Sequence, residues 1–203
     1  MSFRTEEKFF INSDKYVDLK NYLILKGANR QYPRRLIKSI YFDNDNLQSF
    51  IDSQEGSVVR KKIRIRNYPN TTKSKNKTLL ECKISSIEGR YKTSNKLNDN
   101  FTNKFLRYGY FDSLYGLCKP LVEVLYNREY YIFQNGLRVT LDRNIEYYKY
   151  NEPLKKIKNY LIVMEVKSAG PVCSNIILNQ FPFIKNRFSK FAYAVQALYK
   201  KAY

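Results

Sequence analysis

The sequence predicts an α+β protein that consists mostly of antiparallel β-sheet with a few helices packed against it. Short segments rich in β-branched and aromatic residues alternate apolar with polar positions, which is the period-two pattern of strands. Turn residues interrupt these segments, and the sequence contains no convincing repeat and no long Gly/Ser or Pro linker. We therefore expect the 203 residues, 1–203, to form a single domain.

Two segments have the helical spacing of apolar residues instead. Near the N-terminus, Tyr16, Leu19 and Leu23 recur at this spacing, and Gly27 can end the helix. The second segment is an apolar stripe close to the C-terminus, formed by Phe188, Phe191, Val195, Leu198 and Tyr199.

The sequence also predicts two short helices and two exposed loops. The short helices are expected near residues 46–53 and 102–106. The polar stretches at residues 69–77 and 94–104 are expected to be loops, because they are rich in Asn, Ser, Thr and Lys.

The charge of the chain is unusual for its size. There are 37 Lys and Arg residues against 18 Asp and Glu residues, which gives a formal net charge of +19. Such a charge attracts nucleic acids, phosphate polymers, nucleotides or anionic membrane surfaces. Because the sequence has no histidine, it excludes Ser-His-Asp and Cys-His catalysis and His-ligated zinc. Proton transfer and metal binding would depend on carboxylates, Lys or Tyr.

Cysteine usage and the absence of targeting segments favour a cytoplasmic protein. Cys82, Cys118 and Cys173 are odd in number and far apart, and no CxxC motif occurs. The first residues lack the apolar region of a signal peptide, and no run of about 18 apolar residues occurs.

Charged residues recur on one face of several predicted strands. In the segment RKKIRIR (residues 60–66), alternate positions place basic residues on one face and Ile63 and Ile65 on the other. Three further segments, which include Glu81, Glu165 and Arg138, alternate in the same way.

This pattern has two interpretations. The charged face is solvated, as in an ordinary antiparallel sheet, or it lines a central channel of a barrel whose apolar face is covered by helices. Regular Arg-x-Arg and Glu-x-Lys spacing on separate strands favours the channel. Converging cations are tolerated where polyanionic phosphate lies among them.

Nine segments, in their order along the chain, resemble the VTC domain, the catalytic module of polyphosphate polymerases in the triphosphate tunnel metalloenzyme superfamily. They are RTEEKFF (4–10), SIYFDNDNLQSF (39–50), RKKIRIRNY (60–68), LLECKIS (79–85), RYK (90–92), PLVEVLYNREYY (120–131), LRVTLDRNI (137–145), VMEVKS (163–168) and RFSKFAYAV (187–195). The resemblance implies an eight-stranded antiparallel β-barrel with flanking helices, in which basic residues and acidic metal ligands line a tunnel.

The resemblance also implies a set of site residues. The positions that match the basic residues around the triphosphate are Lys8, Arg64, Arg66, Lys83, Arg128, Arg138 and Lys190. Further candidate substrate-binding residues are Lys62, Lys92, Lys167, Arg187 and Ser189. Glu165 matches the metal-binding glutamate, and Glu6 or Glu81 is a possible additional ligand of Mn²⁺ or Mg²⁺. Tyr41 and Phe42 lie in the YFD motif and are assigned to packing.

One departure separates the chain from the related CYTH hydrolases, which begin with ExExK. Here the stretch reads Arg4-Thr5-Glu6-Glu7-Lys8, so that an arginine replaces the first glutamate and one metal carboxylate is lost. This difference disfavours the thiamine-triphosphatase and adenylate cyclase interpretations. SPX and transmembrane segments, which often accompany eukaryotic VTC domains, are absent from the sequence, so we expect a freestanding module.

The expected function is polyphosphate polymerase, in which the γ-phosphoryl group of ATP is transferred to a growing polyphosphate chain. Phosphoryl transfer needs mainly positioning and charge neutralisation, which Arg and Lys with a divalent cation supply. A triphosphatase and a polyanion-binding module without turnover are the alternatives. No nucleic-acid-binding motif occurs, so we expect ATP and polyphosphate rather than a specific nucleic acid as partners.

Overall fold

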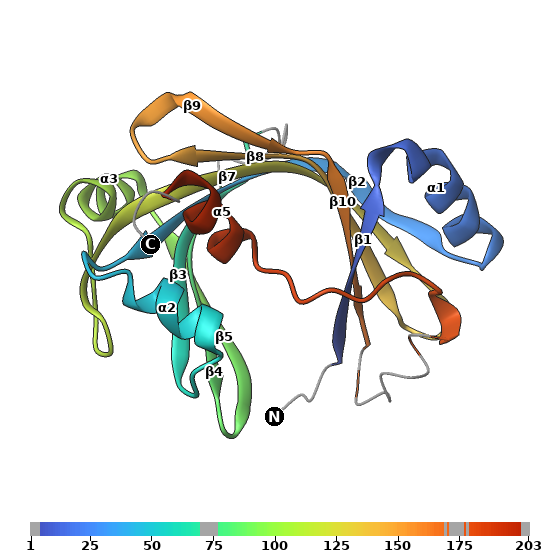
Figure 1. Cartoon of the computed structure of the whole chain (residues 1–203), viewed down its shortest axis with the longest axis horizontal. Helices are drawn as coiled ribbons and strands as arrows, with labels where there is room; N and C mark the ends of the chain where they lie inside the picture. Colours follow the sequence, from blue (N-terminus) through green and yellow to red (C-terminus); the bar gives the residue numbers. More distant parts are fainter. Residues whose placement is uncertain (1–4, 70–76, 169, 171–176, 178, 200–203) are drawn as a thin grey trace. The chain divides into compact units, whose positions relative to one another are not determined.

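The computed structural model describes residues 5–69, 77–168, 170, 177 and 179–199 (Figure 1). The chain folds into two compact units, and each unit is assembled from three separate segments. Unit 1 comprises Met1–Leu36, Tyr126–Ile145 and Lys158–Phe188. Unit 2 comprises Ile37–Leu125, Glu146–Ile157 and Ser189–Tyr203. The single-domain organisation stays a prediction.

Strands make up most of the described chain. They are β1 (Glu6–Asn12), β2 (Asn29–Asp43), β3 (Arg60–Asn67), β4 (Thr78–Ser86), β5 (Gly89–Leu97), β6 (Tyr110–Asp112), β7 (Gly116–Ile132), β8 (Arg138–Lys149), β9 (Glu152–Asn159) and β10 (Leu161–Lys167). The helices are α1 (Tyr16–Leu25), α2 (Gln48–Glu55), α3 (Asp99–Tyr108) and α5 (Lys190–Leu198), and the 3₁₀ turn η1 (Ser13–Lys15) precedes α1. The predicted α+β class is confirmed.

Backbone hydrogen bonds connect the strands in the order β1-β10-β8-β7-β2-β3-β4-β5, while β6 pairs with β7 and β9 with β8. The ten strands exceed the predicted eight, because β6 and β9 pair outside this main order. Among the described residues no pairing joins β1 to β5, so the sheet is not closed into the expected barrel. The outer edge of β1 is instead occupied by the C-terminal segment, because Phe9 forms an antiparallel bridge with Lys185 and the Asn186 amide donates to the Lys8 carbonyl at 2.8 Å.

The core of unit 1 lies on one face of β1, β10 and β8. Phe9 is paired with Met164, and Met164 is paired with Leu141, so these three side chains lie in one row. Leu19 and Leu23 of α1 pack against this row, and all five side chains are at most 2% exposed (Figure 1). Burial of the α1 stripe explains why the predicted N-terminal helix forms.

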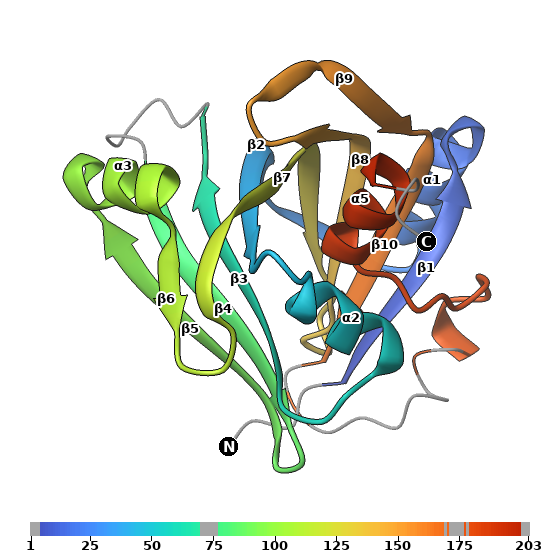
Figure 2. The same ribbon diagram turned by 60° about the vertical axis from the view of Figure 1, so that its left-hand side comes forward.

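The core of unit 2 is built in the same way on the apolar face of β2, β3 and β4. Ile40, Ile65 and Leu80 are paired across these strands and are buried together with Ile63. Figure 2 shows β3, β4 and β5 as neighbouring strands, with α3 following β5. Phe105 is among the residues of α3 that pack against this core.

The predicted loop at residues 94–104 is wrong. Strand β5 continues to Leu97, and α3 begins at Asp99. Asn98 starts the helix because its side-chain oxygen accepts a hydrogen bond from the Phe101 amide at 2.9 Å, and such a cap stabilises a polar helix start. The short helices predicted near 46–53 and 102–106 correspond to α2 and α3. Residues 70–76 of the other predicted loop lie outside the described part.

No helix in the described residues combines the length and apolar character needed to cross a membrane. Within the same residues Cys82 is half-buried and Cys118 is buried, and both are free thiols. Cys173 and Arg4 lie outside the described part of the chain.

Asp43, the last residue of β2, holds the start of α2. Its Oδ1 accepts hydrogen bonds from the Ser49 and Asn44 amides, and its Oδ2 accepts one from the Phe50 amide, each at 2.9 Å. Helix starts leave such amides without backbone partners, so a buried carboxylate that binds them fixes where the helix begins.

We expect Asp43→Ala to lower the free energy of unfolding by about 1–3 kcal/mol, because buried amides lose their acceptor. Chemical denaturation measures this change. Asp45→Ala is the control, because the Asp45 side chain is 79% exposed and its ion pair with Lys119 lies at the surface. Equal stability of the two variants would contradict the capping role.

Candidate functional site: two charged strand faces

In unit 2 the charged face of β3, β4 and β5 carries five of the eleven predicted basic residues, namely Lys62, Arg64, Arg66, Lys83 and Lys92. The predicted alternation is confirmed, because Ile63 and Ile65 are each 1% exposed on the apolar face while Arg64 and Arg66 lie on the opposite face. The charged face is not simply solvated, since Arg66 is only 7% exposed.

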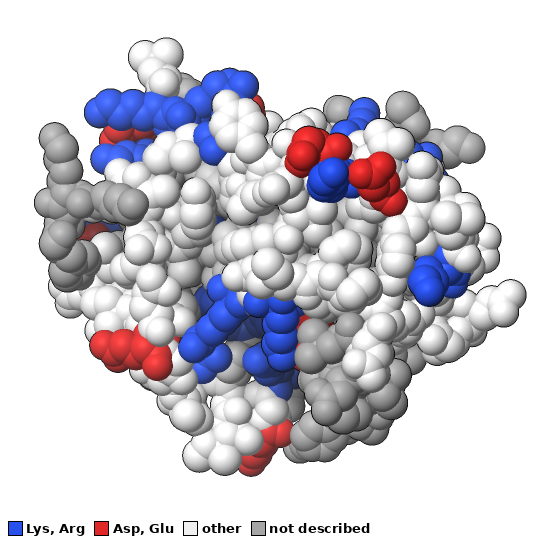
Figure 3. Space-filling model, turned by 45° about the vertical axis from the view of Figure 1, so that its right-hand side comes forward, with Lys and Arg blue, Asp and Glu red and all other residues white. Residues whose placement is uncertain are grey.

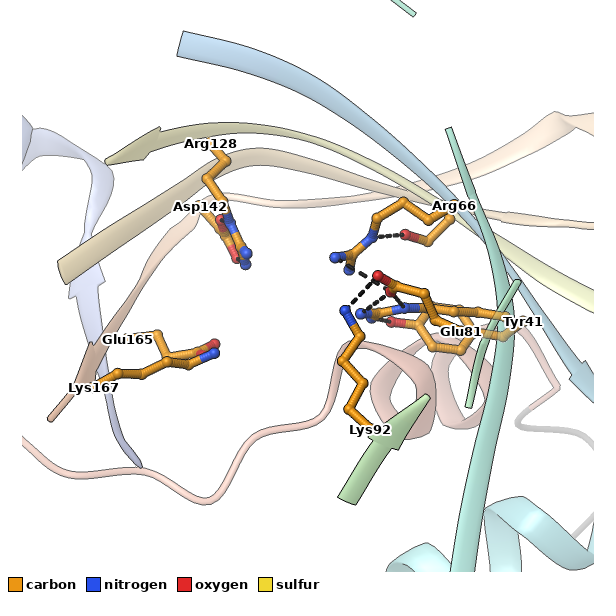
Figure 4. A network of polar contacts seen from close by, with 10 residues as sticks. Tyr41, Arg66, Glu81, Lys92, Arg128, Asp142, Glu165 and Lys167 are labelled. Atoms are coloured by element: carbon orange, nitrogen blue, oxygen red, sulfur yellow. Dashed lines mark hydrogen bonds and ion pairs between the residues drawn. The ribbon is translucent and has the colours of Figure 1, made fainter. Parts of the chain in front are cut away.

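Glu81 of β4 holds three cations on this face. Its Oε2 accepts a hydrogen bond from Arg64 Nε at 2.7 Å and lies 3.5 Å from Arg66 Nη1, and its Oε1 accepts a hydrogen bond from Lys92 Nζ at 2.5 Å (Figure 4). Burial raises the pKa of this carboxyl, but Arg64, Arg66 and Lys92 lower the pKa more, to about 2. Glu81 is therefore ionised at neutral pH and fixes the positions of these cations.

A row of three lysines lies next to Glu81. Lys62 is paired with Lys83, and Lys83 is paired with Lys92, across β3, β4 and β5. Directly opposed like charges destabilise a sheet, so this row costs folding free energy. The cost is reduced where anionic phosphate binds among the ammonium groups.

The start of α5 joins the same face. Ser189 caps the helix, because its Oγ accepts a hydrogen bond from the Ala192 amide at 3.4 Å, and it also accepts one from Lys62 Nζ at 3.0 Å. Lys190 follows as the first helical residue. The resemblance implied Ser189 and Lys190 as well as the basic residues of β3–β5 as site residues, although they are far apart in the sequence. In unit 2 these two groups lie together.

Tyr41 of β2 is a polar member of this cluster, although the YFD motif is assigned above to packing. Its hydroxyl accepts a hydrogen bond from Arg64 Nη1 at 2.9 Å, and its ring stacks on Phe191 with centroids 5.3 Å apart. Phe42 does pack in the core, at 1% exposure. The signal in the sequence is parity, since Tyr41 shares its strand face with Ser39, whose Oγ accepts a hydrogen bond from Arg66 Nε at 3.3 Å.

In unit 1 a second charged face lies on β1, β10 and β8. Lys8 is paired with Glu165 and Glu6 with Lys167, so that acids and bases alternate in both directions. Lys167 Nζ lies 2.5 Å from Glu165 and 3.7 Å from Glu6, and Lys8 Nζ lies 3.3 Å from Glu6. Burial raises the pKa of Glu165, but Lys167, Lys8 and Arg128 lower it far below its usual range.

Arg128 of β7 is held in unit 1 by an acid that the predicted site does not include. Arg128 Nε and Nη2 donate to the two carboxylate oxygens of Asp142 at 2.5 and 2.7 Å (Figure 4). Asp142 is fully buried, and this bidentate pair fixes the guanidinium plane. Burial lowers the pKa of Arg128 but Asp142 raises it more, so the side chain remains charged. The alternation of Arg138, Thr140 and Asp142 is the signal that marks this acid.

The remaining predicted residues also lie in unit 1. Arg138 is paired with Lys167 on the face of β8 that carries Asp142. Arg187 is exposed in the segment that follows the bridge to β1. The same segment fixes the side chain of Lys8, because Lys8 Nζ donates a hydrogen bond to the Phe188 carbonyl at 3.0 Å.

The carboxylates differ in how well they suit a divalent cation. Glu6 and Glu165 converge on one cationic group, Lys167 Nζ, and carboxylate oxygens are donors that Mg²⁺ and Mn²⁺ favour. Glu81 suits a metal less well, because Arg64, Arg66 and Lys92 contact its oxygens directly, whereas the cation in direct contact with Glu165 is Lys167. The described residues contain no group of three or more His, Cys, Asp or Glu side chains that could hold a metal. Two protein donors with phosphate oxygens would fit such an ion.

Solved structures show the class of fold to which this sheet belongs. A putative adenylate cyclase from Bacillus halodurans is 14% identical, with a TM-score of 0.64, and the match covers 98% of each chain. A protein from Pyrococcus horikoshii OT3 is 17% identical with a TM-score of 0.60, over 96% of this chain and 99% of that one. A putative adenylyl cyclase from Hippeastrum, described as having a dominant triphosphatase activity, is 14% identical with a TM-score of 0.59, over 97% and 96%.

The sequence profile of the VTC domain matches residues 3–115 and 113–199, so the chain belongs to the VTC domain family. The recognition of a VTC domain is confirmed, and the chain shares its fold with the solved structures described above. Among curated protein sequences, no relative is found.

We expect Glu81→Gln to destabilise the protein by about 2–4 kcal/mol at pH 7, because three cations lose the negative charge of Glu81. The Lys92 side chain is 47% exposed, so solvent screening makes this loss smaller than that of a fully buried ion pair. The pKa of Glu81 lies at about 2, below its usual value. Its stabilising effect is therefore present above about pH 5 and is lost as the pH falls toward 2.

Urea denaturation between pH 2 and 7 measures this difference, which should shrink as the pH falls. Glu123→Gln is the control, because its 2.8 Å pair with Lys38 is partly exposed. A Glu81→Gln difference that is the same at every pH would contradict the ion-pair role.

Proposed function

We propose that this protein is a polyphosphate polymerase, which transfers the γ-phosphoryl group of ATP to a polyphosphate chain and uses Mn²⁺ or Mg²⁺. Membership of the VTC domain family and the fold shared with tunnel enzymes support a triphosphate-binding enzyme. The cytoplasm, where ATP is available, is the proposed location.

The observation that carries the proposal is the charged face of unit 2. Arg64, Arg66 and Lys92 are held on the buried Glu81, with Lys62 and Lys83 beside them. Glu81 therefore sets the positions of three of these cations in advance. Guanidinium groups held in advance bind phosphate oxygens without a large loss of side-chain entropy. Figure 3 shows Lys and Arg gathered in groups on the face drawn, rather than spread evenly over it.

In the proposed reaction, a terminal phosphate oxygen of the polyphosphate chain attacks the γ-phosphorus of ATP. A new phosphorus–oxygen bond forms, the bond between the γ-phosphorus and the bridging oxygen breaks, and ADP leaves with that oxygen. The side chains of the protein bind and orient the phosphate groups and neutralise their charge. In unit 2, the hydrogen-bond donors for the phosphate oxygens would be Arg64, Arg66, Lys83 and Lys190.

The charged face of unit 1 supplies further proposed groups. Lys8, Arg128 and Arg138 would bind phosphate oxygens, and Asp142 fixes the guanidinium of Arg128. Glu165, with Glu6, would hold the divalent cation. When bound, that ion polarises phosphate oxygens and offsets the charge that develops on them.

A triphosphatase is the second candidate, since the Hippeastrum neighbour is described as having such an activity. Water then replaces the polyphosphate chain as the acceptor, and the same basic residues serve. A polyanion-binding module without turnover is the third, because a +19 chain attracts polyanions whether or not it reacts with them.

Incubation of the purified protein with ATP and Mn²⁺ or Mg²⁺ distinguishes the three candidates. We expect long polyphosphate chains on a gel. Free phosphate as the sole product would indicate the triphosphatase, and tight binding without any product would indicate the binding module.

Two kinds of substitution test the assigned residues. We expect Glu165→Gln to abolish metal-dependent turnover while polyphosphate binding persists. Arg64→Ala and Arg66→Ala should each raise the apparent dissociation constant for ATP on the order of tenfold, as expected for loss of a charge-assisted contact. Lys155→Ala is the matched control, because Lys155 is exposed on β9 of the same unit. Full activity of Glu165→Gln would refute the metal role.

A further inference from the structure

Tyr41 is held on two sides within the charged face of unit 2. It is 5% exposed, its ring stacks on Phe191 at an interplanar angle of 24°, and the Arg64 guanidinium carbon lies 5.6 Å from the ring centroid. Its hydroxyl oxygen accepts the hydrogen bond from Arg64 Nη1. The position of the hydroxyl is therefore fixed before any ligand binds.

A phenol hydroxyl both accepts and donates hydrogen bonds. Tyr41 accepts from Arg64, so its own proton remains available for a second partner. The charged side chains that act most strongly on this hydroxyl are Arg64, Arg66 and Lys190, which offer donors only. The carboxylate of Glu81 is already bound by three cations. An oxygen-rich anion that binds these cations would bring an acceptor, which Arg64, Arg66 and Lys190 do not offer.

We infer that Tyr41 is a phosphate-binding residue, whose hydroxyl donates a hydrogen bond to the phosphate group held by Arg64 and whose ring and oxygen set the orientation of that guanidinium. The inference rests on the proposed function, because it concerns the same triphosphate. It gives Tyr41 a role in ligand binding, whereas the YFD motif alone indicated a role in packing.

The surroundings of Tyr41 give this role a pH dependence. Burial raises the pKa of the phenol, but Arg64, Arg66 and Lys190 lower the pKa more, so the net pKa lies below the usual 10.0. Below that pKa the neutral phenol donates to phosphate. Above it, the phenolate repels phosphate and competes with it for Arg64, so the affinity falls as the pH rises.

Lys92, on the same charged face, also contributes to the pH dependence of phosphate binding. Burial lowers the pKa of Lys92, although Glu81 raises it, so Lys92 also begins to lose its charge below its usual range. This loss weakens phosphate binding in every variant that retains Lys92. The ratio of affinities between wild type and a Tyr41 variant therefore isolates the contribution of Tyr41.

The experiment measures binding of tripolyphosphate by calorimetry from about pH 7 to 10, for the wild type, Tyr41→Phe, Tyr148→Phe and Arg64→Ala. Tyr41→Phe removes one oxygen and keeps the stacked ring. We expect it to weaken binding at pH 7 on the order of tenfold, as for a hydrogen bond to a charged group. The ratio should shrink toward pH 10. Tyr148→Phe is the control, because its hydroxyl binds Glu146 at 2.6 Å, and it should bind as the wild type does.

Each other outcome overturns the inference. If Tyr41→Phe binds as tightly as the wild type while Arg64→Ala does not, the Tyr41 role fails and the proposed function stands. If the ratio is constant with pH, Tyr41 only orients Arg64 and donates nothing. If the wild type does not bind tripolyphosphate, the proposed function fails as well. Should Tyr41→Phe not fold, Lys92→Arg serves as the background, because arginine stays charged to pH 10, and an affinity of this variant that stays flat to pH 10 refutes a donor at Tyr41.

Discussion

Buried carboxylates decide where the cations of this protein lie. Glu81 gathers Arg64, Arg66 and Lys92 in unit 2, and Asp142 binds Arg128 through two parallel hydrogen bonds in unit 1. Long basic side chains without such partners would adopt many rotamers and separate by repulsion. The acids therefore convert a high net charge into cations with defined positions.

The same strands supply both the core and the charged faces. Pleating sends Ile63 and Ile65 to the apolar side of β3 and Arg64 and Arg66 to the other side, so the register that buries the core also aligns the charges. A shift of one residue would reverse both faces at once. The position of each functional side chain is in this way tied to hydrophobic burial, which is the larger contribution to folding.

Local pattern was sufficient to predict the α+β class, the parity of the charged strands and the N-terminal helix, because alternation and helical spacing are properties of neighbouring residues. Local pattern was not sufficient to predict which charged side chains contact one another. The residues next to Glu81 do not indicate that it binds three cations, since these lie on β3 and β5 and reach Glu81 only through the pairing of the strands. The helix α3 was predicted too short, because its start depends on the Asn98 cap within a polar stretch. The packing role first given to Tyr41 was incomplete, because its partner Arg64 lies on another strand. Closure of the barrel was expected from the resemblance, and pairing of β1 with residues near Lys185 could not be read from local sequence.

Each compact unit is discontinuous along the chain, since each is assembled from three separated segments and strands β2, β7, β8 and β9 contribute residues to both. No single stretch of the gene encodes either unit. A recombination event with one breakpoint between β6 and β7 would transfer Glu81 and its cations but would separate them from the segments of unit 2 that begin at Glu146 and Ser189. Exchange of one contiguous segment therefore cannot transfer one unit without part of the other.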